Sequence, residues 1–152
     1  MKTAAVIDRK EMVKRLNEDL SREYQAVIAY VTYSQVLKGA EYSDIAKELE
    51  KHASEELAHA IKICKQIDYL GGTPTVTPKA VQQSEKPTEM LRFDLENERV
   101  TIKNYRERIR QAEAMGEYAL SETLRQIIAQ EQDHLIDLAD ALGINAPDAN
   151  QA

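Results

Sequence analysis

Apolar residues recur along four stretches of the chain in alternating steps of three and four. Leu16 and Leu20 belong to the first stretch, and Leu120 and Leu124 belong to the last. This spacing places side chains on one face of an α-helix, so the pattern predicts helices over 8–38, 43–70, 86–115 and 117–142. Long helices with a single apolar seam bury it by packing together. We therefore predict an all-α fold, a four-helix bundle formed as one domain over 1–152.

Polar residues and glycines mark the expected helix ends. Asp8 followed by Glu11 has the spacing of a capping box, and Ser43 is placed to cap the second helix. Gly143 follows the last apolar seam, at a position where glycine commonly ends a helix. The residues 144–152 are few and polar, and we expect them to form a flexible C-terminal tail rather than another packed helix.

One connection in the chain is long. From 73 to 86 the helical periodicity disappears, and Pro74, Pro78 and Pro87 oppose helix continuation. About 14 extended residues reach about 45 Å, and a helix of about 28 residues is about 42 Å long. The segment is therefore long enough to cross the whole bundle, although a slack loop between antiparallel neighbours would also fit.

Six ionisable residues occupy seam positions that the pattern otherwise fills with apolar side chains. They lie near the middles of their helices, so a bundle would gather them at one level of its interior: Glu23, Glu56, His59, Glu98, Glu131 and His134. Buried carboxylates are costly without a compensating charge. Two divalent ions would balance four carboxylates, and ligation by carboxylates and imidazoles suits iron, manganese or zinc. The sequence therefore predicts a dinuclear metal site, with one Glu from each of two helices and Glu-x-x-His from each of the other two.

The two halves of the chain repeat this arrangement. Glu56 and Glu131 each precede a histidine by three residues, and each follows a lone glutamate by 33 residues. Tyr30 and Tyr105 each follow that lone glutamate by seven residues, and we interpret them as packing residues or as hydrogen-bond donors to the ligands. Any one of these polar residues alone would be explained by partners or solvent, so the repeat carries the prediction. We expect His52, one turn before Glu56, to lie beside the ligands or to face solvent rather than to bind metal.

Composition and charge exclude several classes of function. The net charge of −6 and the lack of a basic patch argue against a nucleic-acid partner. No apolar run approaches the roughly 18 residues of a membrane span, and the apolar run near the N-terminus is too short for a secretion signal. Cys64 is the only cysteine, which excludes an internal disulfide and favours a reducing compartment. We expect a cytoplasmic protein without a membrane partner.

Four local motifs resemble the bacterioferritin family, within the ferritin-like di-iron carboxylate superfamily. They are Glu-Tyr-Gln-Ala from Glu23, Glu-Leu-Ala-His-Ala from Glu56, Met-Leu-Arg-x-Asp-Leu from Met90 and Glu-Gln-Asp-His from Glu131. The resemblance implies that the long connection is a crossover. It also implies that Glu23 and Glu98 are terminal ligands, that Glu56 and Glu131 bridge two iron ions, and that each histidine ligates one of them.

Two departures limit what the resemblance implies. Bacterioferritins carry a haem-binding methionine between the Glu and His of the second helix, where this chain has Leu57 and Ala58. Haem is therefore not expected. The family also has a short fifth helix that helps close its shell, whereas this chain has only a tail after Leu142. We expect a homo-oligomer. A shell smaller than that of the family and a dimer are both compatible with the sequence.

Three functions are compatible with these residues. The first is a di-iron ferroxidase that oxidises Fe(II) to Fe(III) with dioxygen or peroxide, for iron storage or detoxification. The second is a di-iron or di-manganese oxidase or peroxidase that acts on another substrate, with Tyr30 or Tyr105 as a radical or proton donor. The third is a non-enzymatic bundle whose polar seam residues bond to one another.

Overall fold

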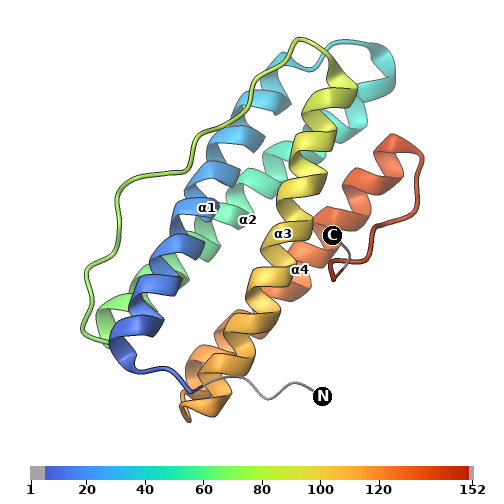
Figure 1. The fold of residues 1–152 in the computed structure, drawn as a ribbon. Coiled ribbons are helices and arrows are strands. Elements are labelled where there is room, and N and C mark those ends of the chain that lie inside the picture. The colour runs from blue at the N-terminus through green and yellow to red at the C-terminus, as the bar shows by residue number, and fades with distance from the viewer. Residues whose placement is uncertain (1–5, 151–152) are drawn as a thin grey trace.

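Four long helices form the bundle, in a computed structural model that describes residues 6–150 (Figure 1). The helices are α1 (Arg9–Val36), α2 (Ser43–Tyr69), α3 (Pro87–Ala114) and α4 (Tyr118–Leu142), and a 3₁₀ turn, η1 (Ala40–Tyr42), precedes α2. Their ends differ from the predicted bounds by at most two residues. The all-α, four-helix fold class predicted from the apolar seams is confirmed. Among residues 6–150, no helix combines the length and the apolar character that a bilayer crossing requires.

The helix ends follow local chemistry, with one correction. The Asp8 side chain accepts a hydrogen bond from the Glu11 backbone N–H at 2.8 Å, as a capping residue does. Ser43 does not cap α2: the capping position is Tyr42, and the Ser43 hydroxyl instead donates to the Ala40 carbonyl at 3.1 Å. The 3₁₀ turn η1, which sequence reasoning missed, moves the start of α2 relative to Ser43.

Gly116 allows the sharp turn between α3 and α4. Its φ is +76°, a left-handed conformation that costs glycine little. The backbone N–H of Glu117 reaches the Ala112 carbonyl at 2.9 Å, which satisfies a carbonyl at the end of α3. The two helices are therefore antiparallel neighbours joined by very few residues.

The long connection crosses the bundle alongside α1 (Figure 1). Asn17, near the start of α1, donates to the Thr73 carbonyl, and Gln25 donates to the Ala80 carbonyl. The Tyr33 hydroxyl, near the end of α1, donates to the Gln82 carbonyl. Because contacts with later residues of the connection occur further along α1, the segment runs parallel to that helix. It returns the chain to the opposite end of the bundle, where α3 begins antiparallel to α1.

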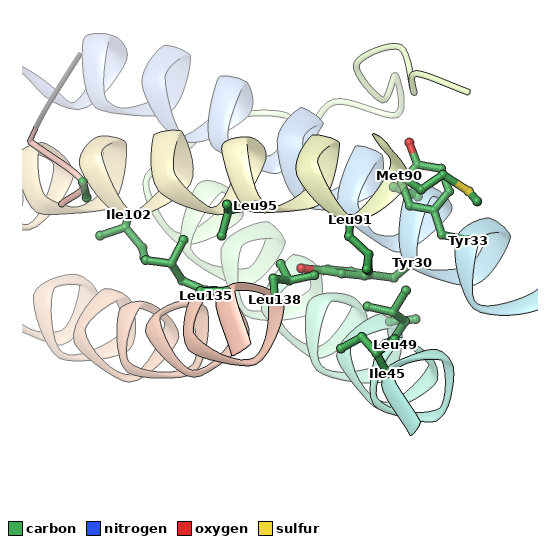
Figure 2. Packing of buried hydrophobic residues seen from close by; sticks show 14 residues of the cluster. Tyr30, Tyr33, Ile45, Leu49, Met90, Leu91, Leu95, Ile102, Leu135 and Leu138 are labelled. Atoms are coloured by element: carbon green, nitrogen blue, oxygen red, sulfur yellow. The ribbon is translucent and has the colours of Figure 1, made fainter. Parts of the chain in front are cut away.

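Two apolar clusters fill the interior on either side of a polar layer. One cluster takes residues from all four helices, which point toward one another in Figure 2: Tyr30, Tyr33, Ile45, Leu49, Met90, Leu91, Leu95, Ile102, Leu135 and Leu138. The other cluster lies toward the opposite end: Met12, Leu16, Leu20, Ile63, Ile67, Tyr105, Leu120, Leu124 and Ile127. Fully burying one such aliphatic side chain contributes about 1.5–3 kcal/mol. These clusters hold the four helices together around the polar residues between them.

The described part of the C-terminal segment folds back onto the bundle. Ala149 is 2 % exposed and belongs to the first apolar cluster, and Arg106 of α3 lies 4.0 Å from Asp148. We predicted a flexible tail over 144–152, but at Ala149 the chain is packed. Its small apolar side chain is buried against Ile102 of α3 and Leu135 of α4. Residues 151–152 lie outside the described part.

Candidate metal centre

All six predicted ligands meet in the polar layer. Each comes from the middle of its helix, and none is more than 2 % exposed: Glu23, Glu56, His59, Glu98, Glu131 and His134. They form two overlapping groups whose ligand atoms lie within 4.8 Å of one another. One group contains Glu23 and His59, the other contains Glu98 and His134, and both contain Glu56 and Glu131. The structure thus places Glu56 and Glu131 between two candidate metal positions.

Each histidine turns its Nδ1 toward carboxylates of other helices. His59 Nδ1 lies 2.9 Å from Glu131 Oε1 and 3.6 Å from Glu23 Oε2. His134 Nδ1 lies 3.0 Å from Glu56 Oε1 and 3.8 Å from Glu98 Oε1. The two imidazoles therefore face the same cluster of oxygen atoms from opposite helices, α2 and α4.

Most of the inward-facing atoms lack a hydrogen-bond partner. Within the described residues, the unpartnered buried atoms include Glu23 Oε2, Glu56 Oε1, His59 Nδ1, Glu98 Oε2, both carboxylate oxygens of Glu131, and His134 Nδ1. Buried polar atoms without partners are rare in folded proteins and costly. Oxygen and imidazole atoms directed at one another without hydrogen-bond geometry are the donor set that a divalent metal ion takes. The residues present therefore fit a dinuclear metal centre.

The electrostatics of the metal-free cluster favour bound protons. Burial raises the pKa of Glu56 well above its usual value, and the nearby Glu23 carboxylate adds to this. Burial likewise raises the pKa of Glu131, with a contribution from Glu56. Burial opposes the charged form of Glu98, but contact with His134 outweighs it and lowers the pKa of that carboxyl.

The two histidines bind protons because carboxylates surround them. Burial alone would lower the pKa of His59, but contacts with the Glu131 and Glu23 carboxylates raise that pKa to about 10. Burial also opposes the charged form of His134, and contact with Glu98 raises its pKa to about 9. Protons on these groups partly neutralise the carboxylates when no metal ion does so.

Tyr30 and Tyr105 hold two of the carboxylates. Tyr30 of α1 donates a hydrogen bond to Glu98 Oε1 of α3 at 2.8 Å, and Tyr105 of α3 donates to Glu23 Oε1 of α1 at 2.5 Å. Burial first, and then the neighbouring carboxylate, raises the pKa of each phenol well above its usual value. Both tyrosines are therefore neutral donors that fix the side chains of Glu98 and Glu23.

Sequence reasoning missed a polar bridge behind the two histidines. His59 Nε2 lies 2.5 Å from Gln130 Oε1, and Gln130 Nε2 donates to Glu55 Oε2 at 2.8 Å. The other Glu55 oxygen lies 3.3 Å from His134 Nε2. Hydrogen bonds at Nε2 leave Nδ1 of each imidazole free to face the centre. A signal was present, because Glu55 and Gln130 each stand directly before the Glu of a Glu-x-x-His motif.

A second pair of polar residues was also missed. Asp19 and Asp94 each lie four residues before a lone glutamate, and both are buried. Asp19 accepts a hydrogen bond from Arg108 Nε at 2.7 Å. Asp94 Oδ2 has no hydrogen-bond partner among the described residues, and burial followed by the charge of Glu98 raises its pKa well above the usual value. The internal repeat of the chain thus extends beyond the ligands, with different partners in each half.

His52 is buried rather than solvent-facing. It is 1 % exposed, and its ring stacks on His134 with centroids 4.0 Å apart. His52 therefore lies beside the predicted ligands, which was one of the two predicted positions. The other, a solvent-facing side chain, is wrong.

Comparison with known proteins identifies the family. The family model described as "Ferritin: Ferritin-like domain" matches residues 13–144, which is most of the chain. The chain belongs to the ferritin-like family. A bacterioferritin from Brucella melitensis is 28 % identical over 93 % of this chain and 96 % of its own length. A bacterioferritin from Desulfovibrio desulfuricans is 26 % identical over 84 % of this chain and 73 % of its own length. These relatives support the resemblance to the bacterioferritin and ferritin-like di-iron group.

Two solved structures share the ferritin-like fold. A ferritin-like, diiron-carboxylate protein from Bacillus anthracis has a TM-score of 0.86 and 36 % identity, and the match covers 91 % of this chain and 99 % of that one. A dodecameric thioferritin from Bacteroides fragilis, described as bacterioferritin-related, has a TM-score of 0.83 and 29 % identity over 90 % of this chain and 87 % of that one. The crossover between α2 and α3, implied by the family resemblance, is present in this chain.

Proposed function

We propose that this protein is a ferroxidase that binds two Fe(II) ions as substrate among its six central residues and oxidises them to Fe(III), for iron storage or detoxification. The observation that carries the proposal is the cluster of buried carboxylate and imidazole atoms without hydrogen-bond partners. Membership of the ferritin-like family and the likeness to bacterioferritins support it. Manganese or zinc would also fit the donor set.

The proposed roles follow from position. Glu56 and Glu131 would bridge the two ions, because each belongs to both groups of ligand atoms. Glu23 and His59 would complete one position, and Glu98 and His134 would complete the other. Iron supplies the redox chemistry: each Fe(II) gives one electron, and the pair reduces dioxygen to peroxide or peroxide to water.

The protein's own groups prepare the site. Tyr30 and Tyr105 hold the terminal carboxylates, and the Glu55–Gln130 bridge fixes both histidines, so the ligands need little rearrangement when iron binds. Carboxylates stabilise the higher charge of Fe(III) relative to Fe(II) by electrostatic attraction. The centre therefore favours oxidised iron.

Burial favours small reactants over a large substrate. The six central residues are at most 2 % exposed, so metal ions, dioxygen and peroxide are the species that this interior accommodates most readily. The same burial disfavours the form of the second function in which an oxidase or peroxidase acts on a large organic substrate.

We further propose that the protein is a cytoplasmic homo-oligomer. Apolar side chains remain exposed on the outer faces of α1 and α2, including Val31 at 51 %, Leu57 at 52 % and Ile61 at 63 %. Exposed apolar residues on a soluble bundle favour association. The likeness to a dodecameric protein supports a closed assembly, and sedimentation of the native protein measures its subunit number.

Oxidation kinetics test the proposed function. Metal-free native protein is loaded with Fe(II) under anaerobic conditions and then mixed with oxygen or peroxide. We expect a fast phase that saturates at about two irons per chain. Glu131→Gln should abolish the fast phase, whereas Glu122→Gln, the same change at an exposed position of α4, should leave it intact. A fast phase of equal amplitude and rate in Glu131→Gln would overturn the assignment.

A further inference from the structure

A third group of possible metal ligands lies outside the six-residue centre. Glu48 and His52 stand one turn apart on α2, and Asp137 faces them from α4. Each offers one ligand atom, and these atoms lie within 4.8 Å of one another. An ion about 2.1 Å from each ligand holds opposite ligand atoms about 4.2 Å apart, so small side-chain movements suffice to close the group around one ion.

The imidazole of His52 is already held in place. Its ring stacks on His134 with an interplanar angle of 25°, and the edge of Tyr30 contacts it at a centroid distance of 5.1 Å. Its Nε2 lies 3.0 Å from Asp137 Oδ2. The side chain is 1 % exposed, so its rotamer is fixed before any ligand binds. A preorganised ligand loses little conformational entropy on binding.

The two carboxylates open onto solvent. Glu48 is exposed, the Asp137 side chain is 40 % exposed, and both line a surface pocket of about 470 Å³. Other acidic residues line the same pocket, beside the single cation Lys47: Glu41, Asp44 and Asp140. Within residues 6–150, Glu48 forms no ion pair or side-chain hydrogen bond. A pocket lined by excess negative charge raises the local concentration of cations.

These observations go beyond a simple histidine–aspartate hydrogen bond. Such a bond needs only two residues, whereas here a third residue, Glu48, offers a carboxylate oxygen within 4.8 Å of the ligand atoms of His52 and Asp137. We propose that Glu48, His52 and Asp137 form a mononuclear site for a divalent transition-metal ion, separate from the dinuclear centre. One imidazole and two carboxylates suit Zn(II), Fe(II) or Mn(II), and three protein ligands leave the remaining positions to water from the pocket.

Zinc binding tests the site independently of any oxidation. Metal-free native protein is dialysed to equilibrium against Zn(II), and bound zinc is measured per chain. We expect about three ions in the wild type and about two in Glu48→Gln. Glu48 is exposed and unpartnered, so its substitution leaves the fold intact. The matched control, Glu41→Gln, makes the same change in the same pocket at a residue outside the ligand group, and it should retain about three ions.

Two outcomes would overturn the site: equal zinc content in Glu48→Gln and the wild type, or an equal loss in Glu41→Gln. The second would show general attraction by the acidic pocket. Glu131→Gln, which alters only the dinuclear centre, should still bind the ion at His52. Anomalous diffraction from zinc-soaked crystals should place this ion beside His52 Nε2, and a peak elsewhere in the pocket would contradict the proposal.

Discussion

Metal binding should release protons from the interior of this protein. In the metal-free centre, His59 and His134 have pKa values of about 10 and about 9, so both are protonated at pH 7. Burial also raises the pKa values of Glu56 and Glu131, but the Glu131 carboxylate is itself what raises the pKa of His59, so the protons are counted on the two imidazoles. Metal ligands must be deprotonated. Loading two divalent ions should therefore release at least the two imidazole protons per chain.

The released protons also bear on charge. Two divalent ions bring a charge of about +4, and the release of about two protons offsets about half of it. The separate site at His52 adds little to the count. Burial, reinforced by the nearby charge of His134, lowers the pKa of His52, so its imidazole is neutral at pH 7.

A pH-stat titration measures the release. Zn(II) is added to metal-free native protein in unbuffered salt at pH 7, and the base needed to hold the pH is recorded per protein chain. Zinc avoids the protons that iron oxidation and hydrolysis would add. Glu131→Gln removes a shared ligand and the carboxylate that raises the pKa of His59, so its release should fall below that of the wild type. A wild-type release of less than one proton per chain would refute the protonation of the two imidazoles.

Three further outcomes follow from the same structure. Arg108→Met should lower the free energy of unfolding of the metal-free protein in urea by about 3–5 kcal/mol, because it leaves Asp19 buried and unpaired. Adding Asp19→Asn to Arg108→Met should recover most of this loss. A double variant whose loss equals the sum of the two single losses would contradict the pairing. The stability of the metal-free protein should fall as pH rises from about 6.5 to about 10. The pKa values of His59 and His134 are raised in the folded state, so between these pH values the folded state binds more protons than the unfolded state. A stability that rises over this range would contradict these pKa values. Glu131→Gln should raise the metal-free Tm by about 2–4 °C at pH 8, because it removes a buried carboxyl. It should lose most of the Tm gain on adding Zn(II), and a variant that keeps the full gain would count against Glu131 as a ligand.

The helices and the six central residues could be predicted because both leave a periodic record in the sequence. An apolar seam must recur every three or four residues to stay on one face, and a polar residue in that seam is conspicuous. The repeat of Glu56 and His59 by Glu131 and His134 then separates a shared site from isolated polar residues. The structure brings all six together, as expected.

The route of the chain and the support of the site left a weaker record. The connection after Gly72 was long enough for a crossover or a slack loop, and only its hydrogen bonds along α1 decide between them. Glu55 and Gln130 contact each other across 75 residues of sequence, beside the seam rather than in it. Arg108 pairs with Asp19 across 89 residues. Such pairs depend on how the helices are rotated against one another, which single-helix periodicity does not specify.

The most direct test of the dinuclear centre is anomalous diffraction at the iron edge from crystals loaded anaerobically with Fe(II). We predict two peaks inside the bundle, about 3.5–4 Å apart. Both should lie beside Glu56 and Glu131, with His59 Nδ1 bound to one ion and His134 Nδ1 bound to the other. Iron found only at the surface, with none among these residues, would contradict the assignment.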